Sequence, residues 1–146
     1  MQNPTADRVR AHTADDINQG LDAEASARVA QYAGAGTAAI TRRIEELNRE
    51  WDTERILEMN ASALAFFGVA RAALSDRKWL IVPSIVLPFL FLHAVQGWCP
   101  PLPILRRIGV RTRGEIDREK YALKALRGDF EALDGSAQAA FHAAGK

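Results

Sequence analysis

The feature that most constrains this chain is a stretch of twenty residues, 79–98, without a formal charge. A helix needs about 20 mostly apolar residues to cross the hydrocarbon core of a bilayer. Trp79 and Trp98 stand at the two ends of the stretch, where aromatic side chains gather at membrane surfaces. The sequence therefore predicts a transmembrane helix here.

Residues 56–74 form a second and weaker candidate, with Glu58 near one end and Arg71 near the other. Small residues recur on one helix face at spacings of four, three and four: Ala61, Ala65, Gly68 and Ala72. In lipid, helices associate through close backbone approach at small residues. We expect this face to pack on the other span or on a copy of the chain. The alternative is a buried helix of a soluble bundle.

Residues 75–78 alone separate the two candidates, so the pair must form an antiparallel hairpin. Arginines gather on the terminal side of both spans: Arg42, Arg43, Arg49, Arg55, Arg106, Arg107, Arg111, Arg113 and Arg118. The link contributes only Arg77 and Lys78. By the positive-inside rule, we expect both termini in the cytoplasm and the hairpin in a bacterial inner membrane.

Two amphipathic helices are predicted outside the hairpin. One has an apolar stripe at spacings of four, three and four: Ile40, Ile44, Leu47 and Trp51. The other has a longer stripe and should end at Gly135: Ile116, Leu123, Leu126, Phe130 and Leu133. Its opposite face is charged and includes Glu119 and Lys124. We expect the stripes to pair, with a homo-oligomer, a larger membrane complex or the lipid surface covering the rest.

Three residues near the end of the second span are candidate functional residues: His93, Gln96 and Cys99. An ionisable side chain inside a span is a functional hypothesis by default, and the alternative is a neutral histidine bonded to a neighbouring helix or subunit. Cys99 is either a reactive thiol or a small packing residue. His93 lies six positions earlier, so we expect it on a different face from Cys99.

Beyond the span, Ile104, Leu105 and Ile108 alternate with Arg106 and Arg107. This pattern predicts a short interfacial helix whose arginines lie at the lipid headgroups. The single cysteine excludes an intrachain disulfide and a multi-cysteine metal site. We assign no catalytic, cofactor or metal residue. A net charge of +1 gives no argument for nucleic-acid binding, and we expect none.

Residues 96–112, QGWCPPLPILRRIGVRT, resemble the YgaP-like inner-membrane hairpin family, a domain of unknown function. The likeness rests on Gly97-Trp98-Cys99-Pro100 and on Gly109-Val110-Arg111-Thr112, and it covers roughly residues 50–131. The resemblance implies a two-span hairpin. Some family members carry a fused rhodanese sulfurtransferase domain, which has no counterpart in this sequence, so the resemblance implies no sulfur transfer by this chain and supplies no catalytic residue.

The predicted fold class is all-α: a membrane-embedded two-helix hairpin flanked by cytoplasmic amphipathic helices. The segments are 1–36, two short helices; 37–52, an amphipathic helix; 53–99, the hairpin; and 100–146, an interfacial turn and the C-terminal amphipathic helix. The predicted function is a non-catalytic structural or interaction subunit, or an anchor. The alternative is a redox or sulfur-handling membrane accessory that uses Cys99.

Overall fold

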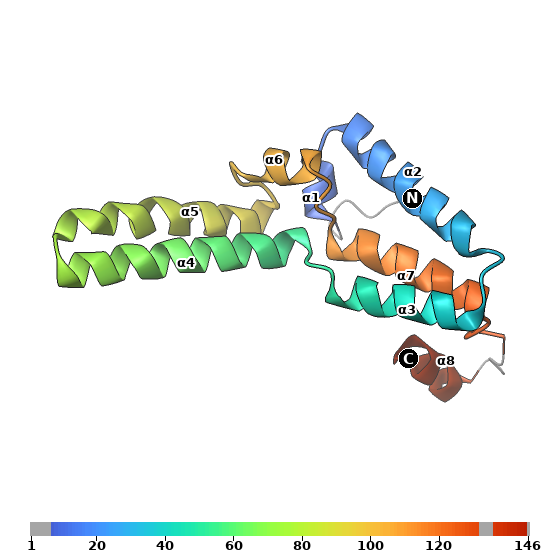
Figure 1. The fold of residues 1–146 in the computed structure, drawn as a ribbon. Coiled ribbons are helices and arrows are strands. Elements are labelled where there is room, and N and C mark those ends of the chain that lie inside the picture. Colours follow the sequence, from blue (N-terminus) through green and yellow to red (C-terminus); the bar gives the residue numbers. More distant parts are fainter. Residues whose placement is uncertain (1–6, 132–135, 146) are drawn as a thin grey trace. The chain divides into compact units, whose positions relative to one another are not determined.

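The computed structural model describes residues 7–131 and 136–145, and within these ranges it contains helices and no strand (Figure 1). The helices are α1 (Arg8–Ala11), α2 (Asp15–Tyr32), α3 (Thr37–Arg49), α4 (Thr53–Leu74), the 3-10 helix η1 (Arg77–Leu80), α5 (Ile81–Gln96), α6 (Leu102–Arg107), α7 (Arg113–Arg127) and α8 (Ala137–Gly145). The predicted all-α class is confirmed for this part of the chain.

The chain divides into two compact units. The first comprises Met1–Leu21 and Trp51–Arg113, and the second comprises Asp22–Glu50 and Gly114–Lys146. The first unit therefore holds α1, α4, η1, α5 and α6, whereas the second holds α3 and most of α2 and α7. Each unit combines stretches that are far apart in the sequence.

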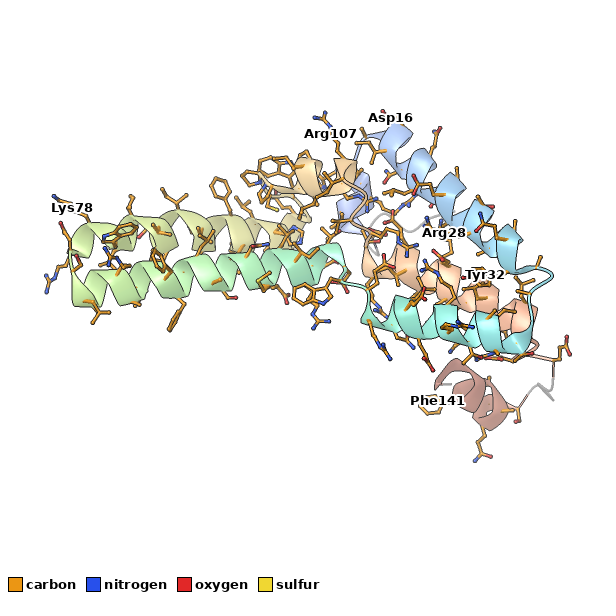
Figure 2. All side chains as sticks on the ribbon, viewed as in Figure 1. Asp16, Arg28, Tyr32, Lys78, Arg107 and Phe141 are labelled. Atoms are coloured by element: carbon orange, nitrogen blue, oxygen red, sulfur yellow. The ribbon has the colours of Figure 1, made fainter. Side chains whose placement is uncertain are left out.

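In the first unit, α4 and α5 lie side by side as a hairpin (Figure 1). The carboxylate of Asp52 caps α4 by accepting a hydrogen bond from the backbone N–H of Arg55 at 2.8 Å. Asp76 does the same for η1, accepting from the backbone N–H of Lys78 at 2.9 Å. Lys78 lies at this closed end of the hairpin (Figure 2). The opposite end, where α4 begins and α5 finishes, is called the base below.

The predicted helix over 79–98 is present with shifted ends, as the continuous helical segment Arg77–Gln96 formed by η1 and α5. Trp79 belongs to η1, and α5 stops at Gln96 because Gly97 adopts the left-handed conformation with φ 80°. The helix continues through Pro88. At about 2.0 Å rise per 3-10 residue and 1.5 Å per α residue, η1 and α5 together are about 32 Å long.

The core of the second unit joins α3 to α7, which confirms the predicted pairing of the two stripes. The buried members are Ile40, Ile44 and Leu47 of α3 with Ile116 and Leu123 of α7. Val29 and Tyr32 of α2 also pack on this core, and Figure 2 labels Tyr32 there. The sequence predicted one helix starting near Thr13 and a second one capped by Asp22, but α2 runs unbroken through Asp22 from Asp15 to Tyr32. It therefore supplies a third helix to the core.

The outer ends of both stripes were predicted wrongly. Trp51 is 43% exposed because α3 ends at Arg49 and the backbone of Glu50 is extended. Likewise α7 ends at Arg127 because Gly128 has φ 85°, so Leu126 is exposed and Phe130 lies in the following turn. Leu133 and Gly135 lie outside the described residues.

Candidate functional site

Large apolar side chains cover the outer surface of the hairpin (Figure 2). The exposed ones are Met59, Leu64, Phe66, Phe67, Val69 and Leu74 of α4 and Ile81, Ile85, Leu87, Phe89, Phe91 and Val95 of α5. Phe66 is 76% exposed, Leu74 85% and Phe91 70%. Two segments, one ending at Leu74 and one spanning Arg77–Gln96, are long and apolar enough to cross a membrane.

The inner face of the hairpin is lined by small residues. Gly68 is buried, and a Cβ added there would lie 2.6 Å from Cδ of Pro83 and 3.1 Å from the carbonyl oxygen of Trp79. The backbone of α4 therefore approaches η1 and α5 too closely for any side chain. The other members of the predicted small-residue face are partly buried: Ala61, Ala65 and Ala72. Leu64 and Phe67 are exposed.

Trp79 is held at the closed end of the hairpin by α4. Its ring meets Phe67 edge to face, with the ring centroids 5.9 Å apart. The guanidinium carbon of Arg71 lies 5.2 Å from the centre of the Trp79 ring. At the base, the guanidinium carbon of Arg55 lies 4.4 Å from the centre of the Trp51 ring. Each end of the hairpin thus carries an Arg–Trp pair.

At the base, α1 contacts the C-terminus of α5 through Arg8. Nη1 of Arg8 donates hydrogen bonds to the carbonyls of Ala94 (2.6 Å) and Val95 (3.1 Å), two groups that the end of the helix leaves unpaired. A Cβ on Gly97 would clash with Cβ of Arg8, so only glycine fits here. Sequence reasoning missed this cap because Arg8 lies outside any apolar pattern. The glycine that ends the span was the available signal.

Arg106 does not lie at a lipid headgroup, contrary to the prediction. It is 1% exposed, and its guanidinium donates to Oγ1 of Thr13 (3.2 Å), Oδ1 of Asn18 (3.0 Å) and the carbonyl of Val110 (3.0 Å). The helical turn of α6 directs Arg106 inward. It leaves Ile104, Arg107 and Ile108 exposed, and Arg107 projects away from α6 in Figure 2. Of the predicted interfacial residues, Ile104, Ile108 and Arg107 therefore face outward, whereas Arg106 does not.

A cavity of about 230 Å³ lies between α4 and α5, reaches the base and opens at the surface of the hairpin, since Leu64 and Ile85 line it and are about half exposed. The side chains that α4 contributes are Leu57, Asn60, Ala61 and Leu64. Those from α5 are Ile85, Val86, Phe89, Leu90 and His93. The loop after α5 closes it with Cys99, Pro100 and Pro101. The lining is uncharged, and its polar side chains, Asn60 and His93, lie toward the base together with the Cys99 thiol.

The structure brings His93 and Cys99 to the same cavity, although the sequence predicted different faces. The left-handed Gly97 reverses the chain after α5, which returns Cys99 toward the helix that carries His93. His93 is buried, and its Nδ1 atom has no hydrogen-bond partner among the described residues. Gln96 is exposed and is not part of the lining.

Cys99 is a packing residue in this arrangement. It is 3% exposed and shares a small core with Val9, Leu57 and Leu102. It lies in the loop beyond α5, where burial raises the pKa of its thiol. A raised pKa lowers the thiolate fraction at neutral pH, and the thiolate is the reactive form.

The second unit holds a buried carboxylate that was predicted to be exposed. The Glu119 side chain is 0% exposed and accepts from Arg43 (Nη2 at 2.9 Å, Nε at 3.1 Å) and from Nε of Arg28 at 3.2 Å. It therefore links α2, α3 and α7, and Arg28 is labelled on α2 in Figure 2. A signal was available: Glu119 lies three residues after Ile116 and four before Leu123, the spacing of neighbours on one helix face, and both of these are buried.

The described ranges contain no group of three or more His, Cys, Asp or Glu side chains that could hold a metal ion. Neither a family model, nor a curated protein, nor a solved structure matches the chain. The resemblance to the YgaP-like hairpin family therefore stays a prediction.

Proposed function

We propose that this chain is a small integral membrane protein in which the α4–α5 hairpin crosses a bilayer and anchors the helical cluster of α2, α3 and α7. The cluster acts as a non-catalytic structural or interaction module. The observation that carries this proposal is the outer surface of the hairpin, where large apolar side chains of both helices are exposed.

The free energy of that surface favours lipid over water. Burying one large apolar side chain contributes about 1.5–3 kcal/mol, and monomers in water rarely expose apolar patches larger than a few hundred Å². The hairpin exposes such side chains along both helices, with Phe66, Leu74 and Phe91 each more than two thirds exposed. A hydrocarbon core about 30 Å thick matches the length of η1 with α5.

The ends of the hairpin suit the two membrane surfaces. Trp51 stacks with Arg55 at the base, and Trp79 stacks with Arg71 at the closed end. Tryptophan and arginine are typical of the headgroup region, where an apolar body and a polar group are both accommodated. The exposed side chains of Ile104, Arg107 and Ile108 suit the same layer at the base.

We propose the orientation that the arginine distribution favours, with both termini in the cytoplasm of a bacterial cell and the closed end outside the inner membrane. A cysteine at Asp76, in the Cys99→Ser background, tests it. We expect an impermeant maleimide added to intact cells to label this site. Labelling that appears only after lysis would reverse the orientation.

Membrane extraction tests the anchor itself. We expect the protein to stay in the membrane pellet after a wash with alkaline carbonate and to be released by detergent. Replacing Phe66 and Phe91 with lysine should move it to the soluble fraction or to degradation, because a charged side chain in the bilayer costs up to about 2.5–3.5 kcal/mol, the value at its centre. Recovery of the native protein in the carbonate supernatant would refute the span.

The redox or sulfur-handling alternative requires a reactive thiol at Cys99. The burial of Cys99 and the raised pKa of its thiol both predict slow reaction with alkylating agents. We expect iodoacetamide to modify Cys99 in the folded protein more slowly than it modifies glutathione at the same pH. Unfolding in denaturant should raise the rate to that of an ordinary thiol. A folded-state rate above that of glutathione would favour the alternative.

A further inference from the structure

We propose that the cavity between α4 and α5 binds one acyl chain of a bilayer phospholipid, which enters from the surface of the hairpin and lies lengthwise between the two helices. This inference rests on the proposed function, because the bilayer supplies the lipid. It also goes beyond that function. A span needs only fluid hydrocarbon around it, whereas a chain in the cavity is a bound ligand that contacts buried residues of the hairpin.

The strongest observation is that the walls of the cavity expose almost no polar surface. No charged side chain is among the described residues that line it. Two polar side chains belong to the lining, but their polar atoms are turned away from it. The Asn60 side-chain N–H₂ donates to the carbonyl of Ile56 at 2.8 Å, and Nδ1 of His93 is buried. The cavity therefore favours hydrocarbon over any ligand group that needs a polar partner.

The dimensions of the cavity fit a chain. On α5 its lining runs from Ile85 to His93, which is about 12 Å along the axis at about 1.5 Å per residue. A volume of about 230 Å³ over about 12 Å of helix gives a mean cross-section of about 19 Å². One extended hydrocarbon chain has a cross-section of this size, whereas a fused ring system is wider. The shape therefore selects a single chain that lies parallel to the helices.

The cavity opens on the apolar outer surface of the hairpin, where Leu64 and Ile85 line it and are half exposed. Water is a poor occupant, because a buried water molecule needs about two to four polar partners. An unfilled cavity would deprive its walls of dispersion contacts on one side. A chain from the surrounding bilayer supplies those contacts without desolvating a polar group, so it is the favoured occupant.

Photo-crosslinking of the full chain in nanodiscs tests the proposal. The probe is phosphatidylcholine with a diazirine on one acyl chain, and mass spectrometry locates the adducts. Leu57 and Cys99, called the buried pair, line the cavity and are 6% and 3% exposed, so lipid reaches them only through the cavity. Phe66 and Phe91, called the outer pair, are exposed and report the surrounding lipid. We expect adducts at both pairs in the native protein.

A matched pair of variants separates the cavity from the surrounding lipid. Ala61 lines the cavity, whereas Ala63 is exposed on the same helix. Ala61→Leu should reduce the adducts at the buried pair to background and leave those at the outer pair unchanged. Ala63→Leu should leave both unchanged, with circular dichroism showing that both variants fold. Should Ala61→Leu not fold, Val86→Phe fills the cavity from α5 with the same expected loss.

Three outcomes would overturn the acyl-chain site and keep the span. The first is labelling of the outer pair without the buried pair. The second is an equal yield at the buried pair in the native protein and Ala61→Leu, and the third is an equal loss in both alanine variants. If the first outcome came with a dimer that Ala61→Leu dissociates, the cavity would belong to a side chain of a second copy. Adducts at neither pair would refute the span itself, and this site with it.

Discussion

The hairpin of α4 and α5 and the cluster of α2, α3 and α7 are both helical packings, yet they use opposite sets of side chains. In the cluster, branched apolar side chains such as Leu47, Ile116 and Leu123 face inward and are fully buried. In the hairpin, the helices approach closely at Gly68 and three alanines of the same face are partly buried, while most of the large apolar side chains are exposed.

The two packings respond to different driving forces. Burial of large apolar side chains stabilises helices in water, because it removes their surface from solvent. In lipid that force is absent between helices, so van der Waals contact at small residues dominates. The cluster follows the first rule, and the close approach at Gly68 is what the second rule requires of a hairpin that crosses a bilayer, as proposed. With the hairpin in a bilayer, as proposed, one short chain would contain one region packed for water and one region packed for lipid.

Truncating one large apolar side chain in each region should give the largest difference in the loss of stability between the cluster and the hairpin. Leu47→Ala should lower the free energy of unfolding by about 2–5 kcal/mol, because it opens a cavity in a closed core. Phe66→Ala should change it by less than about 1 kcal/mol in detergent, because Phe66 packs little against the rest of the protein. Thermal unfolding followed by circular dichroism measures both. Equal losses would mean that Phe66 is covered by protein.

The next largest effect on stability is expected from removing the buried carboxylate of Glu119. Glu119→Ala should destabilise the cluster by about 2–3 kcal/mol, less than the 3–5 kcal/mol typical of a fully buried pair. The reason is that the side chains of Arg28 and Arg43 remain 30% and 19% exposed. Glu24→Ala is the control, since its carboxylate pairs with the same Arg28 but is 68% exposed. Its expected loss is below about 0.5 kcal/mol.

Urea unfolding of the two variants measures the difference. A loss in Glu119→Ala no larger than in Glu24→Ala would show that the carboxylate is structurally dispensable. Glu119→Gln keeps the volume and one acceptor oxygen, so it should lie between the native protein and Glu119→Ala.

The elements could largely be predicted from the sequence, because periodic apolar residues fixed the stripes Ile40, Ile44 and Leu47 and the partner Ile116 and Leu123. Their ends could not. Gly97 and Gly128 end α5 and α7 through left-handed backbone conformations, which a periodicity analysis does not detect.

The candidate site was predictable in its residues and not in its geometry. His93 and Cys99 were identified from their chemical types, but a linear spacing argument separated them, since it ignored the reversal at Gly97. The buried Arg106 could not be foreseen either. Its partners Thr13 and Asn18 lie about ninety positions earlier in the chain, and no local pattern connects them.

A smaller loss of stability is expected from glycine-to-alanine substitutions, which test how closely the helices of the hairpin approach each other. Gly68→Ala should destabilise the hairpin by about 1–3 kcal/mol, because the new Cβ would lie 2.6 Å from Cδ of Pro83. Gly20→Ala is the matched control in α2, where the new Cβ has open space. It should be neutral or stabilise by up to about 1 kcal/mol. Unfolding in mixed micelles measures both, and a neutral Gly68→Ala would contradict the close approach.

The smallest effect concerns Lys124, which is buried in the second unit. Burial, and next the cation of Lys120, lower the pKa of its ammonium group. Between the lowered pKa of the folded state and the ordinary value near 10.5, the unfolded chain binds more protons than the folded one. The free energy of unfolding should therefore gain a positive contribution from this group as pH rises through that window.

The variant Lys124→Met isolates that contribution, because other lysines and the tyrosines titrate in both proteins. We expect the stability of the native protein to rise relative to Lys124→Met as pH rises through that window. Below the window, Lys124→Met should be the more stable of the two, since it removes a buried charge and keeps a flexible chain of similar length. Urea titrations at pH 7 and at pH 9.5 measure the difference. Parallel pH profiles for the two proteins would mean that the Lys124 ammonium group is solvated in the folded state.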